Sequence, residues 1–397
     1  MLDVVRTGPL EDITIIDCTM AFAGPFGTTL LADLGANVIK VEPPSGDNFR
    51  MMPPFPPDYA RVGSKSDAGV DYGATFASVN RNKRSICLDL KKAEDRETLF
   101  RLCEQADAIV ENMRAGVMDQ LGVGYDAISA RNPKIVYGAV RGYGDPRTGD
   151  SPYSSWPCLD VAGQSAGGLV EATGDLVGIA ISDIYPGTLM ALGLLAAVHR
   201  AQKTGKGQFF DVAMYDAVLT LLKPSIAAYG LTNTERKPGG KSLVPFGLFP
   251  TADGRIAIAA PVERHWGLLC EAMGRPDLVN DERTRTNPKR AKNHEFTEAQ
   301  IAAWTTTKTK QEILDLIGGK VPCGPANTMK EVFADPHTLI RDMIQEYQYP
   351  GENPLGALPG NPIKFKDSPA SFHHGPPKHG EHTEEILAEF GLLKAKE

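Results

Sequence analysis

The stretch ITIIDCTMAFAGPFGTTLLADLGANVIKVE, residues 13–42, determines the fold class. It opens with a short β-branched run, ITIIDC at 13–18, that predicts a buried strand. A helical stretch follows from Gly24 to about Leu34, and NVIKVE at 37–42 predicts a second strand. A strand, a helix and a strand with short joints form a βαβ unit, whose two strands are parallel.

The same alternation continues along the chain. Further strands are predicted at RSICLDL (84–90), AIVENM (108–113), KIVYGAV (134–140), GIAIS (178–182) and QFFDVAM (208–214). The helical stretches between them, including an apolar one that starts at Pro186 and Gly187, must cover both faces of the sheet. The expected fold is therefore an α/β, doubly wound core.

A change in composition near Thr232 predicts a second domain. We expect residues 1–231 to form the large domain, 232–330 a small α+β domain, and 331–397 a C-terminal segment. The small domain should contain a hairpin turning at Asp253 and Gly254. Its helices are expected near 263–273, 294–303 and 309–317, and the C-terminal segment should contain a strand at 362–365 and a helix from Thr383.

The composition excludes some classes of partner. The 397 residues carry a net charge of −7, which argues against nucleic acid or an anionic membrane surface. The six cysteines lie far apart and no Cys/His cluster has zinc-ligand spacing, so neither a metal nor a disulfide framework is expected. The N-terminus lacks the pattern of a secretory signal, and no apolar run reaches the ~18 residues of a membrane span. We expect a cytoplasmic protein.

Asp183 is distinguished from the other ionisable residues by its position. It follows the predicted strand at 178–182, and ligands of α/β sheets bind at the carboxyl ends of strands. Its neighbours Ile181, Ile184 and Tyr185 are mostly apolar, and the loss of hydration raises the pKa and the nucleophilicity of such a carboxylate. The local pattern by itself favours a simpler role, because Asp is also a common helix N-cap.

Several long segments resemble one enzyme family. They are AGPFGTTLLADLGANVIKVEPPSGD (23–47), NRNKRSICLDL (80–90), VENMRAGVMDQLGVGYD (110–126), VRGYG (140–144), ISDIYPG (181–187), RAQKTGKGQFFDVAMYDA (200–217) and VPCGPANTMKEVFADP (321–336). In this order the chain resembles the class III coenzyme A transferases, the family of formyl-CoA and carnitine CoA-transferases and of α-methylacyl-CoA racemase.

The resemblance implies an architecture and a mechanism. Family members are homodimers whose chains interlock like links, each with a Rossmann-like large domain, a small domain and a C-terminal tail that returns to the large domain. The family's D-x-x-x-G motif falls at Asp183–Gly187, so Asp183 would be the nucleophile that forms an anhydride and then an aspartyl-CoA thioester. An acyl-CoA and a small carboxylic acid would be the substrates, with no permanently bound cofactor.

The resemblance also implies contacts with coenzyme A. The residues that match are Asn80, Lys83, Arg84, Asn112, Met113, Arg114, Arg141 and Tyr143. We expect the cations among them to lie past strand ends and to form a rim for the phosphate groups. On the acceptor side we expect contacts from Phe22, which stands where the oxalate-using formyl-CoA enzyme has a polar residue, and from Gly239 and Gly240, in a short stretch that replaces that enzyme's long glycine-rich loop. Pro43 stands where the family frequently has an Arg that contacts the adenine, so this contact is not expected.

Two other roles exist within the family. A racemase needs two acid–base groups, and its histidine has no counterpart here, because the first histidine of the chain is His199. A non-catalytic subunit of a larger complex would lose the aspartate, which this chain keeps. The overall pattern resembles enzymes that use succinyl-CoA and dicarboxylic acids more than those that use formate and oxalate.

Overall fold

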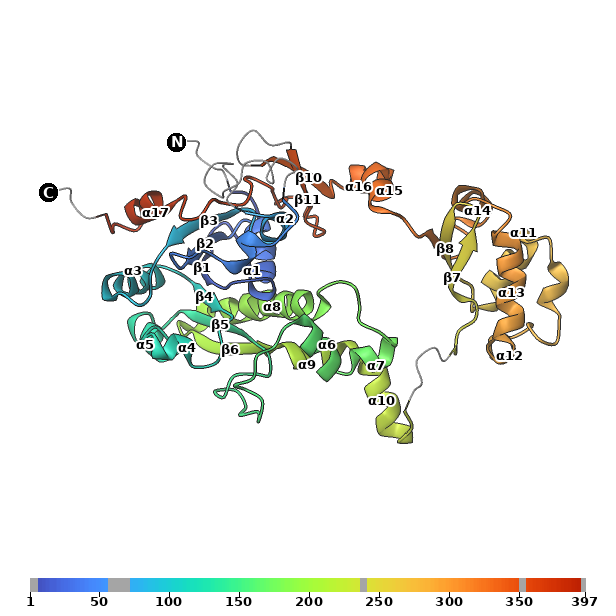
Figure 1. Cartoon of the computed structure of the whole chain (residues 1–397), viewed down its shortest axis with the longest axis horizontal. Helices are drawn as coiled ribbons and strands as arrows, with labels where there is room; N and C mark the ends of the chain where they lie inside the picture. Colours follow the sequence, from blue (N-terminus) through green and yellow to red (C-terminus); the bar gives the residue numbers. More distant parts are fainter. Residues whose placement is uncertain (1–5, 56–71, 236–240, 350–354, 394–397) are drawn as a thin grey trace. The chain divides into compact units, whose positions relative to one another are not determined.

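The computed structural model describes residues 6–55, 72–235, 241–349 and 355–393 (Figure 1). The chain divides into two compact units, one of residues 1–235 and 340–397 and the other of residues 236–339. Both boundaries lie a few residues beyond positions 231 and 330, where the change in composition places them. The smaller unit is therefore inserted into the sequence of the larger one.

A six-stranded sheet forms the centre of the larger unit. Its strands are β1 (Thr14–Cys18), β2 (Asn37–Glu42), β3 (Lys83–Cys87), β4 (Ala108–Glu111), β5 (Val136–Arg141) and β6 (Gln208–Ala213). They lie in the order β3-β2-β1-β4-β5-β6, and all neighbouring pairs are parallel. This is the strand order of the doubly wound, Rossmann-like sheet, so the expected α/β class is confirmed. The order reverses between β1 and β4, where such sheets bind their ligands.

Helices lie between these strands and after the last of them. The helices of the larger unit are α1 (Ala23–Asp33), α2 (Ala74–Ser78), α3 (Ala93–Glu104), α4 (Val117–Gln120), α5 (Tyr125–Arg131), α6 (Asp160–Ala166), α7 (Leu169–Thr173), α8 (Ile181–Thr204), α9 (Met214–Leu221), α10 (Lys223–Thr232) and α17 (Thr383–Glu389), with a 3-10 turn η1 at Asn48–Met51. The region after β6 forms two helices and not one, because Pro224 in the first turn of α10 lacks the N–H that would continue α9.

The side chains of β1 alternate between the two faces of the sheet. Ile15 packs in one core with Val110 of β4 and Leu194 of α8. Ile16 packs in the other core, which includes Leu99 of α3. Both isoleucines are fully buried, and each such burial contributes about 1.5–3 kcal/mol. Helices therefore cover both faces, as the β-branched runs predict.

Helix α8 is the one helix in the described part of the chain that is long and apolar enough, by length and composition, to cross a membrane. Its residues Ala191, Leu194, Ala197 and Val198 pack in a core together with strands of the large sheet. Packing inside the larger unit therefore accounts for its apolar character.

The end of the chain covers the free edge of β3. The Ser85 N–H donates to Nδ1 of His382 (3.2 Å), and the His382 N–H donates to the carbonyl oxygen of Ser85 (3.0 Å). The Cys87 N–H donates to Oγ1 of Thr383 (3.3 Å). An uncovered edge strand would present these groups to other chains, so the tail completes the sheet of the larger unit.

The C-terminal segment also contains a two-stranded antiparallel sheet of β10 (Ile344–Gln348) and β11 (Leu355–Pro359). The strand predicted at 362–365 is wrong, because these residues form no strand. Pro362 has no N–H to donate to a ladder, and β10 and β11 pair with each other upstream of it.

The smaller unit contains a three-stranded antiparallel sheet in the order β7-β8-β9. Its elements are β7 (Phe246–Thr251), β8 (Gly254–Ala259), α11 (Glu263–Ala272), η3 (Pro276–Val279), α12 (Asn287–Lys292), α13 (His294–Thr305), α14 (Lys310–Ile317), β9 (Cys323–Pro325) and α15 (Met329–Ala334), and α16 (Pro336–Ile340) follows at its end. Trp266, Ile301 and Ile313 belong to its buried core. The hairpin and the helices α11, α13 and α14 lie where the sequence pattern predicts them.

Candidate active site

Asp183 lies in the first turn of α8, which begins at Ile181 and has Ala180 as its N-cap. Both local expectations for this segment are wrong. No strand forms at 178–182, because the Gln164 side chain bonds the N–H of Val177 (2.9 Å) and the carbonyl oxygens of Val177 and Ile179, which a strand partner would need. Asp183 is also not the N-cap, since it sits inside the helix.

The surroundings of Asp183 favour its neutral form. Burial raises the pKa of Asp183 to about 7, and the charge of Asp160 adds to this effect. Burial and the charge of Asp183 in turn raise the pKa of the Cys158 thiol. Within the described ranges no cation or hydrogen-bond donor pairs with the Asp183 side chain. An ionised carboxylate in this setting is a better base and nucleophile than one in water.

Tyr143, one of the predicted coenzyme A contacts, lies close to this turn. It is hydrogen-bonded to Cys158, whose thiol interacts with Asp183. The Tyr143 ring packs against Trp156 and Tyr215, with ring centroids 6.4 and 6.0 Å away. Tyr143 therefore belongs to the surroundings of Asp183 and is separated from it by Cys158.

Gly187, which ends the D-x-x-x-G match, brings α8 into backbone contact with α1. A Cβ on Gly187 would overlap the carbonyl oxygen of Ala23, and one on Gly27 would overlap the carbonyl oxygen of Gly187. Asp183 precedes Gly187 by four residues, about 6 Å along the helix. The start of α1, including the preceding Phe22, is thereby held close to the turn that carries Asp183.

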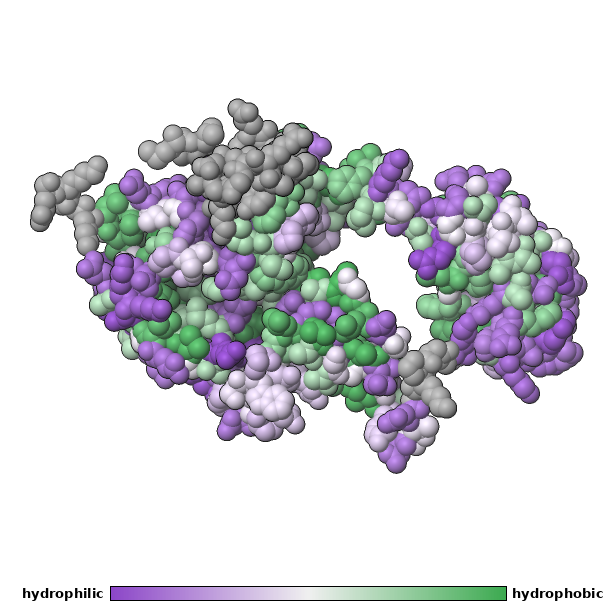
Figure 2. All heavy atoms as spheres, in the orientation of Figure 1, coloured by the Kyte–Doolittle hydropathy of each residue, from purple (hydrophilic) through white to green (hydrophobic). Residues whose placement is uncertain are grey.

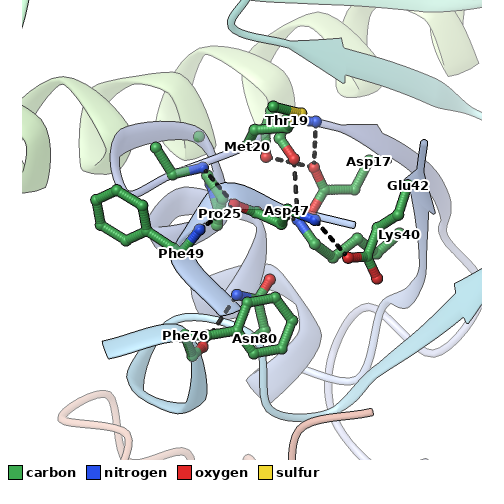
Figure 3. A network of polar contacts seen from close by, with 12 residues as sticks. Asp17, Thr19, Met20, Pro25, Lys40, Glu42, Asp47, Phe49, Phe76 and Asn80 are labelled. Carbon is green, nitrogen blue, oxygen red and sulfur yellow. Dashed lines mark hydrogen bonds and ion pairs between the residues drawn. The ribbon is translucent and has the colours of Figure 1, made fainter. Parts of the chain in front are cut away.

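A buried charge network fixes the loop that leads into α1 (Figure 3). Lys40 Nζ donates to the carbonyl oxygen of Thr19 and to Oδ2 of Asp47, both over 2.9 Å. Asp47 also accepts from the N–H of Ala21 (3.1 Å). This contact supports the left-handed conformation of Ala21, at φ 65°, which residues with a Cβ rarely adopt. The loop is therefore held in place by buried hydrogen bonds within the protein.

Lys83 and Asn80, both predicted to contact coenzyme A, belong to the same network. Lys83 Nζ donates to Oδ2 of Asp17, to the carbonyl oxygen of Pro25 and to Oδ1 of Asn80, each over 3.0 Å. Although burial opposes ionisation, Lys83 and Lys40 hold the pKa of Asp17 at about 2. The expectation that Lys83 lies past a strand end is wrong, because it begins β3 and all three of its donors are used inside the protein.

Arg84 and Arg141 are also paired within the chain. Arg84 lies near the amino end of β3, and not past a strand end as expected, and it binds Glu385 and Glu389 of α17. Arg141 ends β5, but its guanidinium is buried and binds both carboxylate oxygens of Glu111 (2.8 and 2.5 Å). Neither side chain extends into solvent as a phosphate rim requires.

Asn112, Met113 and Arg114 lie just past the end of β4, as expected. The Asn112 amide accepts from the N–H of Met20 (2.8 Å) and donates to its carbonyl oxygen (2.7 Å), and so joins two loops where the strand order reverses. Met113 is half-buried, and its carbonyl accepts from Arg141. Arg114 is exposed, and its guanidinium has no partner among the described residues. Of the four predicted cations, Arg114 is the one available for a phosphate.

The predicted acceptor-side residues are only partly described. Phe22 is the half-buried residue before α1, and its ring stacks on Phe26 and tilts against Phe49, with centroids 6.2 and 6.3 Å away. Gly239 and Gly240 lie outside the described residues.

No group of three or more His, Cys, Asp or Glu in the described residues could hold a metal ion. All six cysteines are described and free. His199 is exposed near the far end of α8, and residues 1–198 contain no histidine. The histidine that a racemase would have in the segment after Gly144 is therefore absent from this part of the sequence.

Two residues that the sequence patterns did not single out hold the turn around Asp183. The Ser182 N–H donates to Oδ1 of Asp160 (2.8 Å), and Nε2 of Gln164 donates to Oδ2 of the same carboxylate (2.8 Å). A signal was present in their spacing, because residues four apart on a helix share one face. Cys158 was likewise missed, because nothing in its local sequence marks it as a neighbour of Asp183.

Fold and site together define an α/β protein of the doubly wound type, with a desolvated carboxylate in the first turn of a core helix. The chain belongs to CoA-transferase family III, which it matches over residues 10–383. The resemblance in the sequence motifs is thereby confirmed.

Individual relatives agree with this assignment. The chain is 40% identical over 394 residues to a succinyl-CoA:mesaconate CoA-transferase of Haloarcula marismortui, covering 97% of both chains. It is 33% identical over 399 residues to the human succinyl-CoA:glutarate CoA-transferase, covering 98% of this chain and 87% of the relative. Among solved structures, a CaiB/BaiF family protein from Brucella suis is 30% identical, with a TM-score of 0.84 over 97% of this chain and 100% of the other.

Proposed function

We propose that this chain transfers coenzyme A from succinyl-CoA to a five-carbon dicarboxylic acid, with Asp183 as the nucleophile. The observation that carries the proposal is the half-buried Asp183 carboxylate, which has no counter-ion among the described residues and whose pKa burial raises to about 7. The names of the relatives support the substrate class, because mesaconate and glutarate are both dicarboxylic acids with five carbons.

The reaction consists of two matched half-reactions. Asp183 attacks the thioester carbon of the donor, the C–S bond breaks, and coenzyme A leaves as a thiolate while an anhydride forms. The thiolate then attacks the Asp183 carbonyl of the anhydride, which releases the donor acid and leaves an aspartyl-CoA thioester. The acceptor carboxylate attacks the aspartyl-CoA thioester, which releases the thiolate and forms a second anhydride. The thiolate then attacks the acceptor acyl carbon of this anhydride and releases the Asp183 carboxylate. The products are acceptor-CoA and free Asp183, and no water is consumed.

The surroundings of Asp183 suit this chemistry. A raised pKa makes the ionised carboxylate more nucleophilic, and it still leaves a large fraction ionised near neutral pH. Burial also keeps water away from the anhydrides, whose hydrolysis would waste the thioester. Lys40 and Asn112 hold the loop that precedes α1, and the start of α1 lies beside the same turn.

We place the phosphate groups of coenzyme A near Arg114, past the end of β4. This position borders the point where the strand order reverses, and the exposed guanidinium has no partner among the described residues. Lys83, Arg84 and Arg141 are each paired with carboxylates of the chain, so we do not place the phosphates on them.

We further propose an interlocked homodimer. Each unit exposes large apolar side chains: in the larger unit Leu159, Ile179 and Leu192, which are 58–72% exposed, and in the smaller unit Phe246 and Leu248, at 62% and 56%. Figure 2 shows hydrophobic surface over α6 and α7. Helix α10 has no buried residue although it contains Ile226 and Leu231. Such surfaces are typical of an assembled interface. Light scattering should give twice the 42.8 kDa of one chain; a monomer would contradict the dimer.

We also propose that the enzyme acts in the cytoplasm, where its six free cysteines would stay reduced. Fractionation of the source cells with an antibody against the chain tests this assignment, and recovery from an oxidising compartment would contradict it.

Mass spectrometry tests the nucleophile. Enzyme incubated with succinyl-CoA and then treated with hydroxylamine or borohydride should carry a modification on the peptide that contains Asp183, and Asp183→Ala should carry none. If Asp183→Ala keeps full turnover, another residue is the nucleophile. A panel of donors and acceptors tests the substrates: activity restricted to monocarboxylic acids would exclude the dicarboxylate proposal.

A further inference from the structure

We propose that Asp160 and Gln164 of α6 form a clamp that holds the first turn of α8, and that Asp160 thereby controls both the position and the reactivity of Asp183. The effect on reactivity rests on the proposed role of Asp183 as nucleophile. The effect on position rests on contacts of the described residues alone.

The first turn of α8 has little support of its own. Its N-cap, Ala180, has no side chain that could accept from the free N–H groups. Pro186 lies inside the helix and lacks an N–H, so the carbonyl oxygen of Ser182 loses the donor that residue 186 would normally supply. The N–H groups of Asp183 and Ile184 donate to the carbonyl oxygen of Ala180 (3.0 and 2.9 Å), whereas the Ser182 N–H has its partner outside the helix.

Asp160 supplies the missing cap from a different helix. Its Oδ1 accepts from the N–H of Ser182 over 2.8 Å, directly beside Asp183. Helix α6 approaches so closely that a Cβ on Gly163 would overlap the hydroxyl oxygen of Ser182. A negative group near a helix N-terminus is also favoured by the helix dipole. Asp160 thus replaces the capping side chain that Ala180 lacks.

Gln164 holds Asp160 and the approach to the helix at the same time. Its Nε2 donates to Oδ2 of Asp160 (2.8 Å), while its Oε1 accepts from the N–H of Val177 (2.9 Å). The side chain is 1% exposed, so solvent does not compete with these bonds. The two carboxylate oxygens of Asp160 are therefore fixed by separate donors, and its orientation toward α8 is determined.

Asp160 is also the charged group that faces Asp183. The Cys158 thiol is the other ionisable group interacting with Asp183. Among the described residues, the charged groups of other elements packed against α8 interact elsewhere: Asp33 of α1 pairs with Arg81, Arg141 of β5 pairs with Glu111, and Asp216 of α9 interacts with Asp211 of β6. Hence a change at Asp160 is the direct way to alter the electrostatic environment of Asp183.

The variant Asp160→Asn removes the charge and keeps one amide oxygen that can accept from the Ser182 N–H, although its Nδ2 can no longer accept from Nε2 of Gln164. Removing the charge lowers the pKa of Asp183, so the acid limb of the kcat/KM profile should move to lower pH. Asp160→Ala removes the cap as well and should lower kcat by up to about 10²-fold through misplacement of the nucleophile. Asp175→Asn is the matched control, since this exposed aspartate lies in the same segment and contacts only its neighbours; its profile should match the parent.

Hydrogen exchange at the Ser182 amide tests the clamp independently of catalysis. The Ser182 amide should exchange faster in Asp160→Ala and in Gln164→Ala than in the parent, by tenfold or more. Unchanged exchange in Asp160→Ala, or an unchanged acid limb in Asp160→Asn, overturns the proposal. If Asp183→Asn remains active, the assignment of the nucleophile fails instead, while the exchange experiment still decides whether the clamp exists.

Discussion

Gly187 of α8 and Gly27 of α1 meet backbone to backbone, at a crossing where neither residue has room for a Cβ. Gly187 is also the last residue of the D-x-x-x-G motif, one turn beyond Asp183. The glycine of the motif is thus explained by packing, because it allows the helix that carries Asp183 to lie directly on the helix that follows the β1 loop.

The variant Gly187→Ala should therefore lose both stability and activity. Its methyl group would overlap the carbonyl oxygen of Ala23, and overpacking of this kind costs about 1–3 kcal/mol. Urea unfolding and steady-state turnover measure the two losses. Gly267→Ala in α11 is the control, because a Cβ there meets open space; equal effects of both variants would argue against the crossing.

The rate should depend on pH through Asp183. Because its pKa is raised to about 7 and the nucleophile must be ionised, kcat/KM should rise with pH and level off above about pH 7. A pH profile with a succinyl-CoA donor measures this limb. An acid limb near pH 4, as for an ordinary aspartate, would show that the carboxylate is hydrated in solution.

The stability of the folded protein should fall as pH rises, whereas the rate should rise. Asp183 binds its proton more tightly in the folded protein than in the unfolded one, so the folded state loses stability as pH rises from about 3.8 to about 7. Asp183→Asn removes this penalty. Its Tm should exceed that of the parent at pH 8, and the difference should shrink as pH falls toward 4. A lower Tm for Asp183→Asn at pH 8 would contradict the desolvation of Asp183.

Arg114 and Arg141 should respond differently to the same substitution. Arg114→Gln should raise KM for acyl-CoA about two- to fivefold with no change in stability, as expected for an exposed charge contact, and added salt should narrow the difference. Arg141→Gln leaves Glu111 buried without its partner and should cost about 3–5 kcal/mol. Substrate titrations and urea unfolding of both variants separate binding from folding.

Lys83 should behave as a structural residue. Lys83→Met leaves Asp17 without one of its two cations, which should cost about 3–5 kcal/mol. The double variant Asp17→Asn with Lys83→Met should recover part of this loss, because no unpaired charge stays buried. Thermal unfolding of the parent, the two single variants and the double variant measures these changes in stability. A Lys83→Met variant with parental Tm and a higher KM for acyl-CoA would restore Lys83 as a phosphate contact.

Strands β1 and β2 could be predicted from sequence because each is a compact run rich in β-branched residues. The run at 13–18 and the run at 37–42 both lie in the strands that they predict. The apolar alternation at 178–182 has the same appearance, yet it is a loop and the start of α8. The difference is that the side chain of Gln164, on helix α6, hydrogen-bonds the backbone groups of this segment, so they are not available to a neighbouring strand. Such a contact has no local signature.

Two of the predicted phosphate cations do not have the exposed position that was expected, for a related reason. Lys83 and Arg141 were judged by their distance from strand ends, whereas their side chains are neutralised by Asp17 of β1 and Glu111 of β4. These carboxylates lie on strands that precede them in sequence by dozens of residues. Which side chains pair across a sheet depends on the order of its strands. The local sequence pattern of each segment predicts a strand but not its neighbours in the sheet. Arg114 has no such neighbour among the described residues, and its position past β4 was predicted correctly.

The tail that covers β3 has a consequence for synthesis on the ribosome. Strand β3 is complete once residue 87 has emerged, but the groups that bond its outer edge, His382 and Thr383, are made almost last. Throughout translation of the intervening residues the edge of β3 stays open and can pair with other nascent chains. We expect the edge of β3 to stay uncovered until the finished polypeptide is released, even if the other strands of the sheet are already paired. Variants truncated before His382 should therefore aggregate during expression.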